Sequence, residues 1–238
     1  MTQRVRMWKW VGTGLISFVV LSAVGFPRAW AQQKARYDLP QILSRMDASG
    51  KRLKSVSADI NYTKVTILVD DKSTEAGRIF FRNPKSPEVL INFTAPDPKV
   101  ILLKKDKAEM YLPKINQVQE YDLSRHQGVV QQFLLLGFGT ESGDLQKGYQ
   151  IKYVSEDELD HNMTVVLELT PRSQNVASQL AKIRLWVSEE SWVPVQQEFY
   201  EPDGDYAIAH YSSMKINQNI SSSIFRIPAA KDAKRVKM

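Results

Sequence analysis

The spacing of apolar residues predicts one helix near the start of the chain and many short strands after it. Asp38-Leu39-Pro40 can open a helix, because Asp caps a helix N-terminus and Pro is tolerated in the first turn. Apolar residues then recur at helical spacing as far as Leu53, and Gly50 is expected to weaken or end the helix. From Ser57 the period changes to two, which is the period of a half-buried strand.

Strand-like segments separated by polar or Pro-containing breaks make up most of the remaining chain. Their spacing, roughly ten residues, favours an antiparallel meander. A second helix is predicted to begin at the capping-box pattern of residues 124–127 and to close at Gly137 and Gly139. Turns are predicted at residues 70–73 and 201–204. We expect about eleven strands, within residues 57–69 (with a change of face near the middle), 77–82, 88–93, 99–104, 107–112, 115–121, 149–155, 162–170, 181–188, 193–200, 205–216 and 224–227.

Several of these strands are apolar on both faces, notably residues 89–93 and 100–103. An antiparallel sheet with one wet face would show clean alternation, so these strands need cover on both sides. A strongly curved sheet around two apolar-striped helices would provide cover and leave a concave apolar space. The pattern does not distinguish a filled core, which is the commoner arrangement, from a ligand cavity. The predicted class is mainly β (α+β), in a single domain.

Charge and composition narrow the classes of partner. The net charge is +6, but Arg4, Arg6, Lys9 and Arg28 precede residue 32 and no acidic residue does. Without these four, 28 basic residues face 26 acidic ones, a net charge of +2, so we expect no nucleic-acid partner. The absence of Cys excludes thiol catalysis, Cys-based zinc sites, iron–sulfur clusters and lipidation on an N-terminal Cys.

The N-terminus has the three parts of a secretory signal peptide. Residues 1–10 carry three positive charges, residues 11–26 are uncharged and mostly apolar, and Ala29-Trp30-Ala31 provides a small-residue cleavage site. The apolar run is shorter than the ~20 residues of a membrane span, although an uncleaved anchor is the alternative. We expect cleavage after Ala31, and an exported domain over 32–238 whose residues 228–238 form a flexible charged tail.

Residues suited to catalysis are sparse. His126, His161 and His210 are the only histidines, and the acidic stretch 157–161 is typical of a solvated turn. No Gly-x-Ser-x-Gly elbow or phosphate-binding loop is present. We therefore predict no catalytic residues, no metal site and no cofactor.

Several segments, in order along the chain, together indicate a protein family. They are Leu53–Ile60, Gly77–Pro84, Phe93–Pro98, Tyr111–Pro113 with Asn116–Val118, Leu167–Pro171 and Asn219–Pro228. Their order and spacing, together with the leader, resemble the LolA family of periplasmic lipoprotein carriers. The resemblance covers nearly all of residues 38–235.

This resemblance implies an incomplete antiparallel β-barrel with a helical lid over an apolar cavity for acyl chains. It implies a soluble, monomeric periplasmic carrier that takes acylated lipoprotein cargo from an inner-membrane release complex and delivers it to an outer-membrane acceptor. The family's Arg-Pro motif maps onto Arg82 as the residue that latches the lid. Asn83 intervenes before Pro84 in this chain, so Arg78 is a second candidate for the latch.

We predict that the cavity is lined by residues of both helices and of several strands. The main alternative function is a periplasmic lipid- or stress-sensing module of the same fold that binds a membrane regulator; an envelope enzyme is a second. The predicted lining residues are Ile42, Met46, Ile79, Phe81, Val89, Ile91, Leu102, Met110, Val129, Phe133 and Leu136.

Overall fold

The computed structural model describes residues 36–83, 86–104, 106–123, 136 and 138–238. The predicted first helix is confirmed as α1, Leu39–Arg52. Asp38 accepts a hydrogen bond from the Gln41 N–H at 2.8 Å, and the Gln41 side chain accepts one from the Asp38 N–H at 3.1 Å. The helix continues through Gly50, so Gly50 does not end it. Its buried residues are Ile42, Leu43, Met46 and Ser49.

Twelve strands of the described chain form a single open sheet. The order is β12-β6-β5-β4-β3-β2-β1-β11-β10-β9-β8-β7, with β12 parallel to β6 and the other neighbours antiparallel. The strands are β1 Ser55–Thr66, β2 Asp71–Arg82, β3 Glu88–Ala95, β4 Lys99–Lys104, β5 Lys107–Leu112, β6 Gln117–Asp122, β7 Tyr149–Leu159, β8 Asn162–Pro171, β9 Lys182–Ser188, β10 Pro194–Tyr200, β11 Tyr206–Ile216 and β12 Lys234–Lys237.

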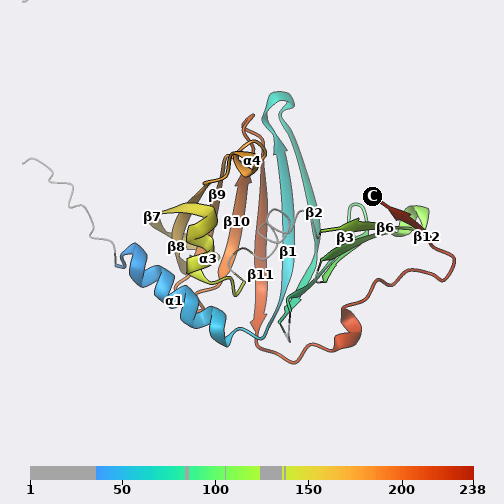
Figure 1. Ribbon diagram of the computed structural model, residues 1–238, viewed down its shortest axis with the longest axis horizontal. Coiled ribbons are helices and arrows are strands. Elements are labelled where there is room, and N and C mark those ends of the chain that lie inside the picture. Colours follow the sequence, from blue (N-terminus) through green and yellow to red (C-terminus); the bar gives the residue numbers. More distant parts are fainter. Residues whose placement is uncertain (1–35, 84–85, 105, 124–135, 137) are drawn as a thin grey trace, which may run out of the picture. The chain divides into compact units, whose positions relative to one another are not determined.

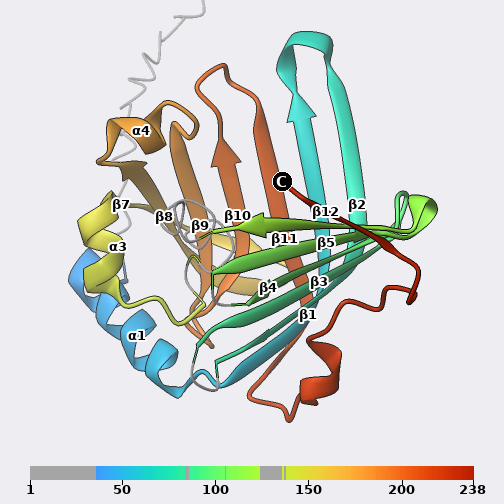
Figure 2. The same ribbon diagram turned by 45° about the vertical axis from the view of Figure 1, so that its right-hand side comes forward.

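The sheet bends strongly, so that β3–β6 run across the direction of β1 and β9–β11 (Figures 1 and 2). Strands on both sides of this bend contribute to one hydrophobic cluster, together with α1. The sheet does not close, since β7 and β12 stand at its two edges. The predicted class, mainly β with an incomplete antiparallel barrel, is therefore confirmed. The predicted second helix falls on residues 124–135 and 137, which lie outside the described residues.

Cross-strand pairing separates the two faces of the sheet. Ile79, Ile91 and Ile101 stand opposite one another on β2, β3 and β4 and face the large cluster, on what we call the inner face. The neighbouring row, Phe80, Leu90 and Leu102, faces the opposite side, called the outer face. A separate cluster covers this row, built around Phe225 of the C-terminal segment. Strands that are apolar on both faces are thus covered by a core on one side and by a returning chain segment on the other.

The connection between β1 and β2 differs from the prediction. The predicted strand over 57–69 ends at Thr66, and Ile67–Val69 forms a 3₁₀ turn, η1. Asp70, at a φ of 50°, closes this turn, and the residues predicted as a turn after it belong to β2. The predicted irregularity in the strand lies earlier, where the register against β11 shifts between Ser57 and Asp59.

The C-terminal part also differs from the prediction. The described residues 224–227 do not form the predicted strand. Ser221 caps a 3₁₀ turn, η3 Ser222–Ile224, and the Phe225 side chain then packs in the cluster on the outer face. The segment predicted as a flexible tail contains β12, whose Arg235 pairs with acidic side chains of β5 and β6.

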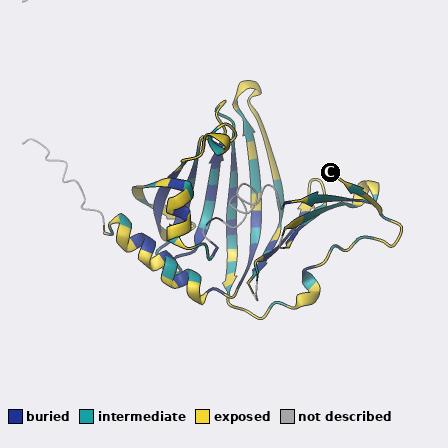
Figure 3. Cartoon of the chain, viewed as in Figure 1, coloured by how far each residue is buried: buried dark blue, intermediate teal, exposed yellow. Residues whose placement is uncertain are grey.

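The remaining helical elements of the described residues are short. They are α3 Ser142–Gly148, between the predicted second helix and the next predicted strand, α4 Gln174–Ala177, and the 3₁₀ turn η2 Pro113–Ile115. No helix in the described part of the chain is both long and apolar enough to span a bilayer. Buried positions concentrate on the strands and on one side of α1, whereas the turns that join the strands are exposed (Figure 3).

Candidate functional site

A cavity of about 340 Å³ opens on the inner face of the sheet. Strands β1–β4, β10 and β11 and the end of the α4 segment form its walls. Most of the wall is apolar, and several of its residues also belong to the hydrophobic cluster that fills the rest of the inner face. The lining residues are Ile60, Tyr62, Glu75, Ile91, Phe93, Lys99, Ile101, Gln179, Leu180, Gln197, Phe199, Glu201, Ala207, Ala209 and Tyr211.

The deep wall of the cavity contains one buried polar network. Gln197 is only 1% exposed; its Nε2 donates to the Leu136 carbonyl at 2.6 Å, and its Oε1 accepts from the Tyr211 hydroxyl at 3.2 Å. The Tyr211 ring meets Phe138 edge-on, with ring centroids 5.4 Å apart. Burial raises the pKa of Tyr211, so its hydroxyl stays protonated and can donate. The network thereby ties the backbone at Leu136 to β10 and β11.

Charged groups stand at the rim of the cavity. Lys99 Nζ lies 2.7 Å from Glu75 Oε1, and the Lys99 ammonium lies 5.2 Å from the centre of the Phe93 ring. Both side chains of the ion pair are about three-quarters buried. Burial, reinforced by the charges of Glu75 and Glu201, raises the pKa of Tyr62 and keeps its hydroxyl neutral. A polar rim over an apolar interior suits an amphipathic ligand.

The predicted lining residues fall into five groups. Ile91 lines the cavity, while Met110 lies on the same face, opposite Ile101 in the register. Leu102 lies on the outer face, so its assignment to the lining is wrong. Val129 and Phe133 lie outside the described residues. The others belong to the closely packed inner-face cluster beside the cavity: Ile42, Met46, Ile79, Phe81, Val89 and Leu136.

The two predicted latch residues share one side of β2. Because Ile79 and Phe81 face inward, the alternate residues Arg78 and Arg82 project to the outer face. The Arg82 guanidinium pairs with Glu88 and lies 4.5 Å from the centre of the Phe225 ring. Among the described residues, these two partners thus lie on the outer face of the sheet.

Arg78 is more exposed than Arg82. Its Nε lies 3.3 Å from Asp59 Oδ1, and its guanidinium lies 5.4 Å from the Phe80 ring centre. These partners are also on the outer side of the sheet. The described contacts of Arg78 therefore connect neighbouring strands, and they give no support to a contact with the cavity.

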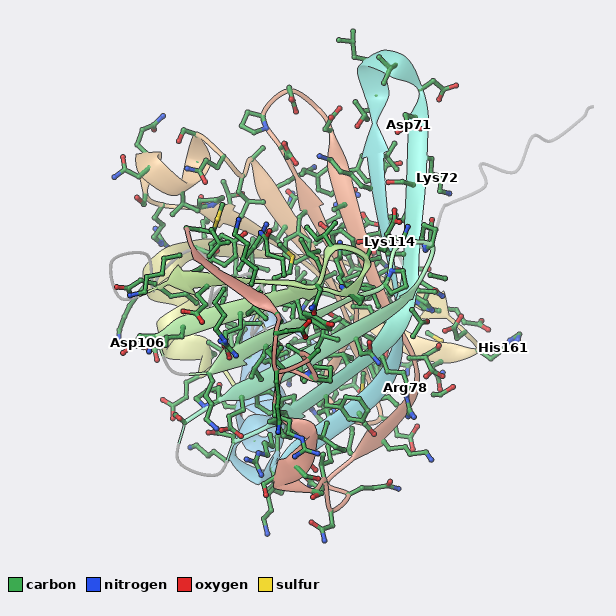
Figure 4. The ribbon with its side chains drawn as sticks, turned by 90° about the vertical axis from the view of Figure 1, so that its right-hand side faces the viewer. Asp71, Lys72, Arg78, Asp106, Lys114 and His161 are labelled. Carbon is green, nitrogen blue, oxygen red and sulfur yellow. The ribbon has the colours of Figure 1, made fainter. Side chains whose placement is uncertain are left out.

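The described histidines lie away from the cavity. His210 Nε2 lies 2.9 Å from Asp160 Oδ2, on the outer side of β11, since the inner side carries Ala209 and Tyr211. His161 is fully exposed in the turn between β7 and β8 (Figure 4). No cluster of three or more His, Asp or Glu that could hold a metal ion occurs in the described ranges.

Sequence reasoning missed the polar residues of the cavity. Gln197 stands on the apolar side of its strand, between Val195 and Phe199 in the alternating pattern. A single amide among apolar residues of the same parity indicates a buried hydrogen-bonding position, and this was the signal available. Glu75 and Lys99 are far apart in the chain, so their pairing could not be predicted without the register.

Residues 87–208, slightly more than half of the chain, match the model of a family described as "Uncharacterized protein". Curated proteins gave no match.

Solved structures share the fold at low sequence identity. An uncharacterized conserved protein from Thermus thermophilus is 16% identical, with a TM-score of 0.54, and the alignment covers 84% of this chain and 98% of that one. MucB is 12% identical, with a TM-score of 0.52, and is covered over 62% of its length by 80% of this chain. This chain thus spans less than two thirds of MucB.

The solved structures also include a LolA superfamily protein from Nitrosomonas europaea. It is 17% identical, with a TM-score of 0.40 and coverage of 79% of this chain and 97% of that one. A similarity with so low a TM-score supports no conclusion about this chain. The structures from Thermus thermophilus and of MucB, at 16% and 12% identity, show a similarity of fold alone.

Proposed function

This chain belongs to the family described as uncharacterized proteins, and we propose that it binds an apolar chain of a lipid or lipid-modified protein in its inner-face cavity. The observation that carries the proposal is the apolar cavity with a charged rim, set between the two halves of a bent sheet. Together with the predicted leader, it supports a carrier that moves lipid or lipoprotein through the periplasm. Its cargo would come from a release complex at the inner membrane and pass to an acceptor at the outer membrane.

The size of the cavity limits the ligand. Its volume of about 340 Å³ is roughly twice that of the 150 Å³ engineered apolar cavity that binds benzene. It lies near the lower end of the usual range for small-molecule sites, about 300–1,000 Å³. We therefore propose that the cavity takes a single acyl chain rather than the several chains of a lipoprotein at once.

Burial of such a chain is energetically sufficient for transport. Each CH₂ group removed from water contributes about 0.8 kcal/mol, so ten groups contribute about 8 kcal/mol. That corresponds to a dissociation constant near 1 μM before the costs of binding. The interaction is strong enough to shield a chain in water and weak enough to permit its release to a membrane.

A cavity-filling substitution tests the proposal. Ala209 lines the cavity, and Ala209→Phe would occupy part of it; Ile208→Phe, on the next residue of β11, changes the opposite face. We expect Ala209→Phe to weaken binding of a fluorescent single-chain fatty acid at least tenfold and Ile208→Phe to leave it unchanged. Equal binding by a folded Ala209→Phe variant would contradict the proposal.

Native mass spectrometry of the protein purified from its own cell envelope gives an independent test. Co-purified lipid or acylated protein, absent from Ala209→Phe, would support the carrier. A lipid-free protein in stable complex with a membrane regulator would instead favour the sensing module.

A further inference from the structure

The turn between β1 and β2 exposes three consecutive large aliphatic side chains. Ile67 is 56% exposed, Leu68 92% and Val69 66%. We call these three residues the hairpin tip. Single exposed apolar residues are ordinary on protein surfaces, but a contiguous group at the end of a hairpin marks a contact site.

The hairpin tip has a defined conformation. The Asp70 N–H donates to the Ile67 carbonyl at 3.2 Å, which closes the 3₁₀ turn. The Ile67 N–H donates to Asp205 Oδ1 at 2.9 Å, from the turn between β10 and β11. Below the tip, the hydroxyls of Thr63 and Thr74 lie 2.9 Å apart across the two strands. These hydrogen bonds hold the aliphatic side chains outward, at a small entropic cost for binding.

The hairpin also projects beyond its neighbour β3. The pairing of β2 with β3 ends at Ala76, so residues 71–75 have no strand on that side among the described residues. Asp71 and Lys72 lie on this projecting part, just below the tip (Figure 4). Tyr62 and Glu75, which pair across the same hairpin, line the cavity. Five residues of strand, about 17 Å, separate Tyr62 from Ile67, so the tip stands beyond the rim of the cavity.

The composition around the tip indicates what it contacts. Residues 64–72 contain no Trp, Tyr or Arg, the residues that dominate binding at protein interfaces. Beside the tip, Tyr206 pairs with Val65 and stacks on Tyr200, and Tyr is a residue enriched at membrane–water interfaces. Residues 64–72 and 201–205 together carry two Lys and five acidic residues, a net charge of −3. Such a surface repels anionic lipid headgroups, so the contact must depend on burial of the aliphatic side chains.

We propose that the hairpin tip inserts into the interfacial region of a lipid bilayer, without a requirement for anionic lipid. Apolar side chains of interfacial segments enter the boundary between headgroups and acyl chains by about 5–10 Å, a depth that removes the three aliphatic side chains of the tip from water. Insertion turns the rim of the cavity towards the membrane surface. The proposal rests on the exposure of the tip and is independent of what the cavity holds.

A site-specific probe tests insertion in the full chain. The sequence contains no Cys, so Leu68→Cys introduces one thiol that can carry a polarity-sensitive fluorophore. Met163→Cys is the matched control, because Met163 is also an exposed apolar residue, 39% exposed, at the other end of the sheet. Contact of the N-terminal residues with vesicles would affect both labelled proteins alike.

With phosphatidylcholine vesicles we expect the probe at position 68 to report an apolar environment and to be quenched by lipid-borne quenchers, and the probe at 163 to report neither. Adding Val69→Ser should raise the vesicle concentration for half the signal about tenfold, since each large aliphatic side chain contributes roughly that factor. Phosphatidylglycerol should not strengthen the signal. A probe at 68 that stays in water with all vesicles would overturn the proposal and favour a protein partner. A signal seen only with anionic vesicles would also overturn it.

Discussion

Replacement of Gln197 by leucine tests the role of the buried network in the cavity wall. The Gln197 amide donates to the Leu136 carbonyl at 2.6 Å and accepts from the Tyr211 hydroxyl at 3.2 Å. Leucine has a similar volume and no polar atoms. In Gln197→Leu both partners therefore lose their hydrogen bond while the packing of the wall changes little.

The size of the effect follows from the surroundings of the two partners. A buried polar group left unpaired costs about 1–3 kcal/mol, so two would cost about 2–6 kcal/mol. Tyr211 lines the cavity, and a water molecule bound there by its hydroxyl would offset part of its loss. We therefore expect the free energy of unfolding to fall by about 2–3 kcal/mol.

Equilibrium unfolding in urea measures this change, and a double-mutant cycle assigns it. Tyr211→Phe alone should cost about 1–3 kcal/mol, because it leaves the buried Gln197 Oε1 without this hydrogen-bond partner. In the Gln197→Leu background the same change should cost almost nothing, since its partner is already lost. A loss below about 0.5 kcal/mol for Gln197→Leu, or strict additivity of the two changes, would refute the reasoning.

Three further changes test other parts of the fold by the same measurement. Burial raises the pKa of Glu88, but hydrogen bonds from Lys104 and Arg82 outweigh it and leave the pKa below its usual value. The ion pairs therefore stabilise the fold above about pH 4.3 and are lost as the pH falls below it. Glu88→Gln should cost about 2 kcal/mol at pH 7 and much less at pH 3; an equal loss at both would contradict this. Phe225→Ala should cost about 3–5 kcal/mol, because it uncovers the outer-face cluster. An unchanged free energy of unfolding would show that this cover is dispensable. Gly77→Ala should cost about 1–3 kcal/mol, because its Cβ would lie 2.2 Å from a backbone oxygen of β3; wild-type stability would show that the strands separate easily.

The periodicity of the chain was sufficient to predict most elements. Helix α1 has a capping box and an apolar stripe, and strands such as β8 and β9 show strong apolar patterns. Both signals are local, so they can be detected without knowledge of the fold. The apolar character of β3 and β4 on both faces also correctly indicated cover on two sides.

The failures have physical causes that lie outside local pattern. Ile67–Val69 was predicted to be strand because apolar residues normally mark buried positions, whereas here they are exposed at the hairpin tip. Strand β12 depends on pairing with β6, far away in the sequence, and its own residues are mostly charged. The short helix α3 has one buried apolar residue, Leu145, too few for a periodic signal.

The cavity could be predicted only in outline. Alternation assigns Ile79 and Ile91 to the same face, but it does not say which of them borders a void and which is packed in the core. Leu102 was assigned to the wrong face because all residues of 100–103 are apolar, so parity gave no preference. A void depends on the bend of the sheet, which is a property of the whole fold.

The most direct test of the central claim is the location of a bound chain. Nuclear Overhauser effects between an isotope-labelled single-chain fatty acid and the side chains of the protein would report it. We expect contacts with Phe93 of β3 and Phe199 of β10, which both line the inner-face cavity. Contacts confined to the outer-face cluster around Phe225, or no contacts at saturating fatty acid, would contradict it.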